Sequence, residues 1–220
     1  MGTEKIKLIA FDIDGTLAET DDYYIEKGVS LMRKVFPFVK PASMEKIVRL
    51  LVMVGETILH SFYRILDYFG LDTVISKIHS KISVDGNYKY RAVTGMKKTL
   101  KLLSKHYSIG IITSGGHQST KAFIEKFKLE KIVNHVISSE DCEFIKPHPM
   151  PLIKMAETAN IKPENILMVG DTVFDILCAK RAGSMSAAVK SGFDTEWFLK
   201  TQTSDFLLKT VNDLPKILGL

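Results

Sequence analysis

The strongest constraint on the fold is a regular alternation of short apolar runs and helical patterns over residues 94–189. The runs have the length of strands that are buried on both faces, and they lie at residues 6–10, 109–112, 136–137, 166–169 and 186–189. The segments before the last four runs repeat apolar residues at helical spacing: Met96, Leu100 and Leu103; Ala122, Phe123 and Phe127; Leu152, Ala156 and Ala159; Ile176, Leu177 and Ala179. This alternation predicts an α/β fold, a doubly wound parallel sheet with helices on both faces.

A purely helical pattern interrupts this alternation after the first run. It has four apolar stripes: Ile25, Val29, Met32 and Phe36; Met44, Ile47, Leu51 and Val54; Ile58, Phe62, Ile65 and Phe69; Leu71, Ile75, Ile78 and Ile82. We therefore expect a helical unit at 18–92, inserted into a core domain made of residues 1–17 and 93–220. The apolar tail, from Trp197 to Leu218, is expected to pack at the edge of the sheet.

Composition excludes several other classes of protein. The net charge of +5 comes mostly from scattered lysines, which are typical of solvated helix faces. No basic run alternates with aromatic residues, so we expect no nucleic-acid partner. The apolar stretches are too short to span a bilayer and no signal-peptide pattern opens the sequence, so we expect no membrane partner and a cytoplasmic location. Cys142 and Cys178 lack metal-ligand spacing and are expected to be free thiols.

Two carboxylates stand where the first strand gives way to a turn. Asp12 and Asp14 follow the opening apolar run, Gly15 allows a sharp bend, and Thr16 adds a hydroxyl. Ligands bind at the carboxyl ends of the strands in open α/β sheets. Neighbouring acids repel each other unless a cation or a shared proton relieves the repulsion, so this corner needs a positive partner.

Three later segments bring further polar groups to strand ends. Thr113 and Ser114 precede two glycines, Lys146 lies between a strand and a proline, and Asp171 and Asp175 are spaced to share one face of a helix. Taken alone, Thr113 or Asp171 could merely cap a helix, and Lys146 could be a surface lysine. Their joint occurrence at successive strand ends makes coincidence a poor explanation and favours one shared site.

Here the sequence resembles the haloacid dehalogenase-like (HAD) superfamily of phosphotransferases. Four motifs carry the resemblance in order: Asp12–Thr16 as Asp-x-Asp-Gly-Thr, Thr113 closing an apolar strand, Lys146 in Lys-Pro-x-Pro, and 170–175 as Gly-Asp-x-x-x-Asp. A helical insert between the first two motifs is similar to the phosphoglycolate phosphatase-like branch. The resemblance implies a Rossmann-like core with an α-helical cap domain.

The resemblance also implies a mechanism. Asp12 would be the nucleophile that forms an aspartyl-phosphate, and Asp14 the general acid and then the base that activates water. Thr113, the backbone N–H of Ser114, and Lys146 would neutralise the transferring phosphoryl oxygens.

The cofactor implied is Mg²⁺, which prefers oxygen ligands. Its ligands would be the carboxylates of Asp12 and Asp171 and the backbone carbonyl of Asp14. Asp175 would lie further out and hold Lys146 or a metal-bound water, and Thr16 would help to orient Asp14.

Substrate selection is assigned to the cap. Arg49, Gly55, Glu56 and Arg64 are the candidate selectors, although each arginine could equally lie on the surface. His117 stands beyond the second motif, where exposure at the start of a helix is expected rather than a place in the pocket.

The function expected is hydrolysis of a small phosphorylated metabolite, a phosphoglycolate-like ester or a sugar phosphate. The alternative is a phosphosugar mutase, an isomerase that uses the same aspartyl-phosphate. A phospho-accepting receiver module has these residue types in another order, and a catalytically inactive binding protein would not need every catalytic position filled. The substrate and the choice between monomer and homodimer stay open.

Overall fold

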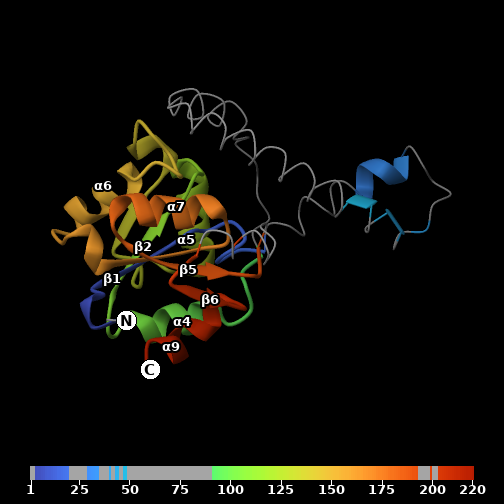
Figure 1. Cartoon of the computed structure of the whole chain (residues 1–220). Helices are drawn as coiled ribbons and strands as arrows, with labels where there is room; N and C mark the ends of the chain where they lie inside the picture. Colours follow the sequence, from blue (N-terminus) through green and yellow to red (C-terminus); the bar gives the residue numbers. More distant parts are fainter. Residues whose placement is uncertain are drawn as a thin grey trace.

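The computed structural model places the core of the chain and part of the segment inserted into it (Figure 1). It describes residues 3–19, 29–34, 40, 43–44, 47–48, 91–192, 199 and 203–220. Candidate selectors Arg49, Gly55, Glu56 and Arg64 lie outside these residues, as do Trp197 and most of the four helical stripes.

A six-stranded parallel sheet forms the centre of the core, in the order β3-β2-β1-β4-β5-β6. The strands are β1 (Leu8–Phe11), β2 (Ser108–Ile112), β3 (His135–Ile137), β4 (Ile166–Gly170), β5 (Met185–Val189) and β6 (Phe206–Leu208). Leu8 of β1 pairs with Ser108 on one side and with Ile166 on the other. The carboxyl ends of β1, β2 and β4 therefore lie next to one another at one edge of the sheet.

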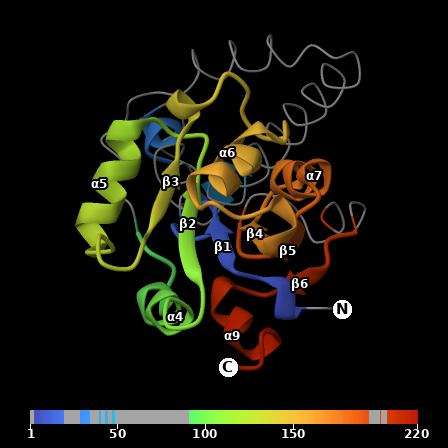
Figure 2. The same ribbon diagram turned by 90° about the vertical axis from the view of Figure 1, so that its left-hand side faces the viewer.

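Helices cover both faces of this sheet (Figures 1 and 2). They are α4 (Met96–Leu103), α5 (His117–Phe127), α6 (Met150–Thr158), α7 (Val173–Ala182) and the short α9 (Leu214–Ile217). Short 3₁₀ turns are η1 (Thr3–Lys5), η2 (Ser139–Asp141), η3 (Pro163–Asn165) and η4 (Val211–Asp213).

Strand β1 shows why both faces are apolar. Ile9 and Phe11 belong to one core cluster, which contains residues of α4, α5 and α9. Leu8 and Ala10 point the other way, into a second cluster with residues of α6 and α7. A strand buried on both faces cannot alternate polar and apolar residues, which explains the continuous apolar runs in the sequence.

The predicted doubly wound parallel sheet is confirmed, with two differences at its margins. The first strand begins at Leu8 rather than Ile6, because Ile6 is held in the turn after η1 by an N–H bond to the Thr3 carbonyl of 3.1 Å. The tail was expected only to pack at the sheet edge, yet it supplies β6. A three-residue edge strand with one buried side chain leaves little periodic signal.

The two ends of the predicted insert lie side by side. Ala18 and Ala92 form an antiparallel bridge, and the N–H of Glu19 donates to the Arg91 carbonyl at 2.7 Å. Arg91 also pairs with Glu19 through side chains 3.3 Å apart. Residues 29–34 are helical, in agreement with the first stripe. The helical unit at 18–92 stays a prediction, which this paired exit and return of the chain supports.

Two further expectations concern thiols and membranes. Cys142 and Cys178 are both free, as predicted. Within the part of the chain that the structure describes, none of the helices combines the length and hydropathy that a bilayer crossing requires.

Neighbouring leucines of α4 test this packing. Leu103 is fully buried, whereas Leu102 is partly exposed on the same helix. We expect Leu103→Ala to lower the free energy of unfolding by about 2–5 kcal/mol, because it leaves a cavity under the sheet. Leu102→Ala is the matched control and should cost less than about 1 kcal/mol. Urea denaturation followed by circular dichroism measures both, and equal losses would contradict this placement of α4.

Candidate active site

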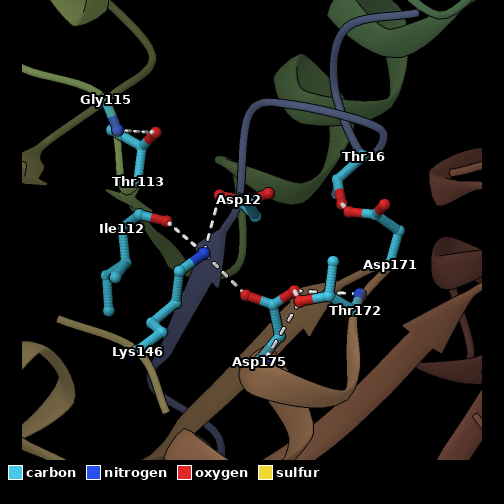
Figure 3. A network of polar contacts seen from close by, with 9 residues as sticks. All are labelled: Asp12, Thr16, Ile112, Thr113, Gly115, Lys146, Asp171, Thr172 and Asp175. Carbon is cyan, nitrogen blue, oxygen red and sulfur yellow. Dashed lines mark hydrogen bonds and ion pairs between the residues drawn. The ribbon is translucent and has the colours of Figure 1, made fainter. Parts of the chain in front are cut away.

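The polar groups of the four motifs meet at the carboxyl ends of β1, β2 and β4 (Figure 3). Asp12 follows β1, Thr113 follows β2, and Asp171 follows β4, and all three are buried. Asp175 lies in the first turn of α7, directly beyond Asp171. The topology therefore brings together residues that are far apart in the sequence.

Lys146 is the positive group that these acids require. Only 6% of its surface is exposed, so the alternative of a surface lysine is wrong. Its Nζ lies 2.7 Å from Asp12 Oδ1 and 2.6 Å from Asp175 Oδ1, and it donates a longer bond of 3.4 Å to the Ile112 carbonyl. The Lys146–Pro147 peptide is cis, and Arg181 of α7 donates to the Pro147 carbonyl at 3.2 Å.

Asp175 is fixed by the start of its own helix. Thr172 is the N-cap of α7, and the two residues form a capping box. The Thr172 backbone N–H and hydroxyl donate to Asp175 Oδ2 at 3.0 and 2.6 Å, which leaves Oδ1 for Lys146. Because Thr172 is the cap, the alternative reading of Asp171 as a helix cap is wrong.

Asp171 is held among small residues. The Thr16 hydroxyl donates to Asp171 Oδ1 at 2.9 Å. The sequence analysis expected Thr16 to orient Asp14, whereas this hydrogen bond orients Asp171. A Cβ atom on Gly15 or on Gly192 would collide with Asp171 Oδ2. Gly15 also has a φ of 73°, which other residues adopt at a cost. The sequence analysis missed Gly192, although its place after β5 marks another strand end.

Burial and crowding set the charge states of the site. Carboxylate oxygens of Asp12, Asp171 and Asp175 lie within 4.8 Å of one another. Burial, together with the neighbouring acids, raises the pKa of Asp12 to about 7 even though Lys146 opposes the shift. Burial alone would lower the pKa of Lys146, but the charges of Asp12 and Asp175 raise it above its ordinary value.

Three buried carboxylates beside one lysine are suited to a hard divalent cation. Asp12 and Asp171 are the carboxylates expected as its ligands. Asp175 belongs to the same cluster, and its contact with Lys146 agrees with the holding role expected of it. The carbonyl of Asp14 stays a predicted ligand.

The second motif forms a tight loop before α5. The Thr113 hydroxyl accepts the Gly115 N–H at 3.0 Å, while Gly116 is the N-cap and has no side-chain cap. The reading of Thr113 as the cap of α5 is therefore wrong. Glu140 instead accepts the N–H of His117 at 2.9 Å. His117 is exposed at the helix start, as expected, but its pairing with Glu140 was missed.

Removal of one charge from the acid cluster should stabilise the metal-free protein. We expect Asp12→Asn to raise the melting temperature in chelator, because the buried carboxylate repels two others. The folded pKa of Asp12 lies above its ordinary 3.8, so the wild type loses stability as the pH rises towards about 7. The gain in the variant should therefore grow between pH 4 and 7 and then level off. A scan of melting temperature against pH measures it, and a gain that shrinks over this range would contradict the charge assignment.

Gly192 should be required for cation binding. Gly192→Ala adds a methyl group against the Asp171 carboxylate, so we expect weaker Mg²⁺ binding by at least about tenfold, equal to 1.4 kcal/mol. Gly219→Ala is the control, because a Cβ atom there meets no other atom within 4 Å. Isothermal titration with Mg²⁺ measures both, and unchanged affinity of Gly192→Ala would show that Asp171 is free to move.

Comparisons with known proteins identify the family of this chain. The family model of the haloacid dehalogenase-like hydrolases matches residues 9–189. Pyrophosphatase PpaX of Bacillus anthracis is 29% identical over 98% of this chain and 97% of its own length. Two solved structures share the fold: a predicted phosphoglycolate phosphatase from Haemophilus somnus and a HAD phosphatase from Thermococcus onnurineus. The first has a TM-score of 0.68 at 18% identity and covers 98% of this chain and 99% of its own. The second has a TM-score of 0.62 at 22% identity and covers 97% and 98%. Because the family match spans most of the chain and all four groups of site residues, this chain belongs to the haloacid dehalogenase-like hydrolase family.

Proposed function

We propose that this hydrolase is a Mg²⁺-dependent phosphatase that acts on a small phosphomonoester through an aspartyl-phosphate on Asp12. The observation that carries the proposal is the buried ion pair of Lys146 with Asp12 and Asp175, beside the carboxylate of Asp171. A structural ion pair would not need a third buried acid. A phosphoryl-transfer site does, because it must hold both a nucleophile and a cation.

Asp12 attacks phosphorus in this proposal. An Asp12 oxygen forms a bond to phosphorus while the bond to the leaving oxygen breaks. Mg²⁺, held by Asp12, Asp171 and the Asp14 carbonyl, would supply positive charge that offsets repulsion between carboxylate and phosphate. Lys146, the Thr113 hydroxyl and the Ser114 N–H would neutralise the charge of the phosphoryl oxygens.

Asp14 moves the protons. It follows Asp12 by two residues at the turn, where it donates a proton to the leaving alkoxide. It then takes a proton from water, and the resulting hydroxide attacks phosphorus and releases the Asp12 carboxylate. Thr16 supports this step indirectly, since its hydroxyl holds Asp171 beside the same turn.

The inserted segment would act as the cap that selects the leaving group and excludes water. The bridge between Ala18 and Ala92 gives it two adjacent connections to the core, next to the turn that carries Asp14. Arg49, Gly55, Glu56 and Arg64 are the proposed selectors. A small phosphorylated metabolite as partner and a cytoplasmic setting complete the proposal.

Inorganic pyrophosphate is the second candidate substrate. The observation that favours it is the 29% identity over nearly the whole chain to a protein named pyrophosphatase. The core chemistry would be unchanged, with phosphate in place of an alkoxide as the leaving group. The mutase alternative would use the same core as well, but none of the relatives reported above bears such a name.

Phosphate release decides among these functions. We expect the wild type with Mg²⁺ to release phosphate from at least one member of a panel of small phosphomonoesters and pyrophosphate, and to stop in chelator. Asp12→Asn should lower kcat by at least about 10³-fold, because it removes the nucleophile. Glu164→Gln, on the exposed turn η3, is the matched control and should behave as the wild type.

Each outcome has one meaning. Release from pyrophosphate alone would select the second candidate. No release from any compound, together with conversion of a hexose phosphate in the presence of its bisphosphate, would select the mutase. Full activity of Asp12→Asn would overturn the aspartyl-phosphate.

A further inference from the structure

We propose that His117 is a positioning residue whose positive charge fastens the phosphate-binding loop to the neighbouring turn η2 and compensates the acids there. The phosphate-binding loop is residues 113–116, between β2 and α5. The inference rests on the proposed function for the role of that loop. His117, Glu140 and Asp141 belong to none of the four motifs.

Both ring nitrogens of His117 contact acids. Nδ1 lies 3.1 Å from Glu140 Oε2, and Nε2 lies 3.0 Å from Asp141 Oδ1. Only the protonated imidazole donates from both nitrogens at once, so this geometry requires the imidazolium. The hydrogen bond to Asp141 is the largest effect on the pKa of His117; burial opposes it, and with the added charges of both acids the pKa lies above its ordinary 6.5.

Glu140 reaches the loop because Gly116 has no side chain. Its Oε1 accepts the N–H of His117 at 2.9 Å and so takes the place of the missing side-chain cap of α5. A Cβ atom on Gly116 would collide with Glu140 Oε1. The glycine therefore allows a carboxylate to sit at the first N–H of the helix.

Further bonds tie η2 to the loop. The Ser139 N–H and hydroxyl both donate to the Gly115 carbonyl, at 3.1 and 3.2 Å. Within the turn, the Ser138 N–H and hydroxyl both donate to Asp141 Oδ2 at 2.7 Å. Glu140 and Asp141 are thus held in place, and His117 is the residue that joins both carboxylates to the start of α5.

The charges around the start of α5 affect how well the loop can bind a phosphate. The positive end of a helix favours a bound phosphate, but a carboxylate at that end opposes it. Glu140 and Asp141 bring two negative charges beside the loop, and His117 supplies the cation that faces both. Lys121 of α5 pairs with Glu125 at 3.8 Å, while Lys154 of α6 donates to the Asp141 carbonyl and so adds a second positive charge at η2.

The ion pairs of His117 with Glu140 and Asp141 are exposed, so we expect them to affect phosphate binding rather than stability. The His117 side chain is 56% exposed, and exposed ion pairs contribute little to stability. We expect His117→Gln to leave the melting temperature and kcat nearly unchanged. The KM for a phosphomonoester such as p-nitrophenyl phosphate should rise, and the affinity for inorganic phosphate with Mg²⁺ should fall, each by about 2- to 5-fold. His106→Gln, an exposed histidine before β2, is the matched control and should change neither.

The pH dependence separates charge from shape. The ratio of phosphate affinities, wild type over His117→Gln, should fall towards one as the pH rises through the pKa of His117, which is measured by NMR titration of its ring. Above that pKa the wild-type imidazole is neutral and has lost the compensating charge. The ratio cancels the titrations of Asp12 and of phosphate itself, which both proteins share.

A second substitution tests the acid. Glu140→Gln in the His117→Gln background should restore phosphate affinity, because it removes the uncompensated charge and keeps an oxygen for the helix N–H. A ratio that stays constant with pH, or a double variant no better than the single one, would overturn the proposal. If the wild type hydrolyses no phosphate compound, the proposed function fails instead, and the affinities for inorganic phosphate still decide whether His117 acts on the loop.

Discussion

The ion pair between Lys146 and two buried acids is the contact on which the site depends. A buried ammonium without partners would lose its proton or destabilise the fold around it. A buried carboxylate without partners would take up a proton or destabilise the fold in the same way. Asp12 comes from the end of β1 and Asp175 from α7, so the lysine joins two elements that are far apart in the sequence. The loop of Lys146 is held a second time by α7, through Arg181. Helix α7 thus holds the ammonium of Lys146 through Asp175 and the backbone next to Lys146 through Arg181.

The sheet provides the rigidity that such a cluster needs. Three buried acids repel one another, and a flexible scaffold would relax until they separated. Here Asp12 and Asp171 follow strands, and Asp175 lies in a helix that packs on the sheet. The apolar residues of these elements belong to the core clusters on the two faces of the sheet. The free energy gained by burying this core therefore offsets the repulsion among the three acids. Small residues surround Asp171 because a side chain at Gly15 or Gly192 would occupy the space of its carboxylate.

Sequence reasoning predicted the fold class, the central strands and the residues that meet at their ends, because these depend on periodicity and on motifs that fix the backbone locally. It could not predict β6, whose three residues have no period of their own, or the partner of Thr16, which lies 155 residues away. Gly192 and Glu140 were missed for a related reason. Their roles come from a close approach in space, and an isolated glycine or an acid in a turn carries no sign of its neighbour.

Backbone contacts at Glu19 and Arg91 join the two ends of the inserted segment where it leaves the core. The chain leaves the core at Glu19 and returns to it at Arg91, so the segment between these residues has two neighbouring ends. Because the two ends are paired, we expect the junction to keep its spacing when the length of the segment between them changes. If that segment selects the leaving group, as we propose, new specificities could arise there while the acids of the core stay in place. A shared core with divergent specificities is the evolutionary pattern that such a junction permits.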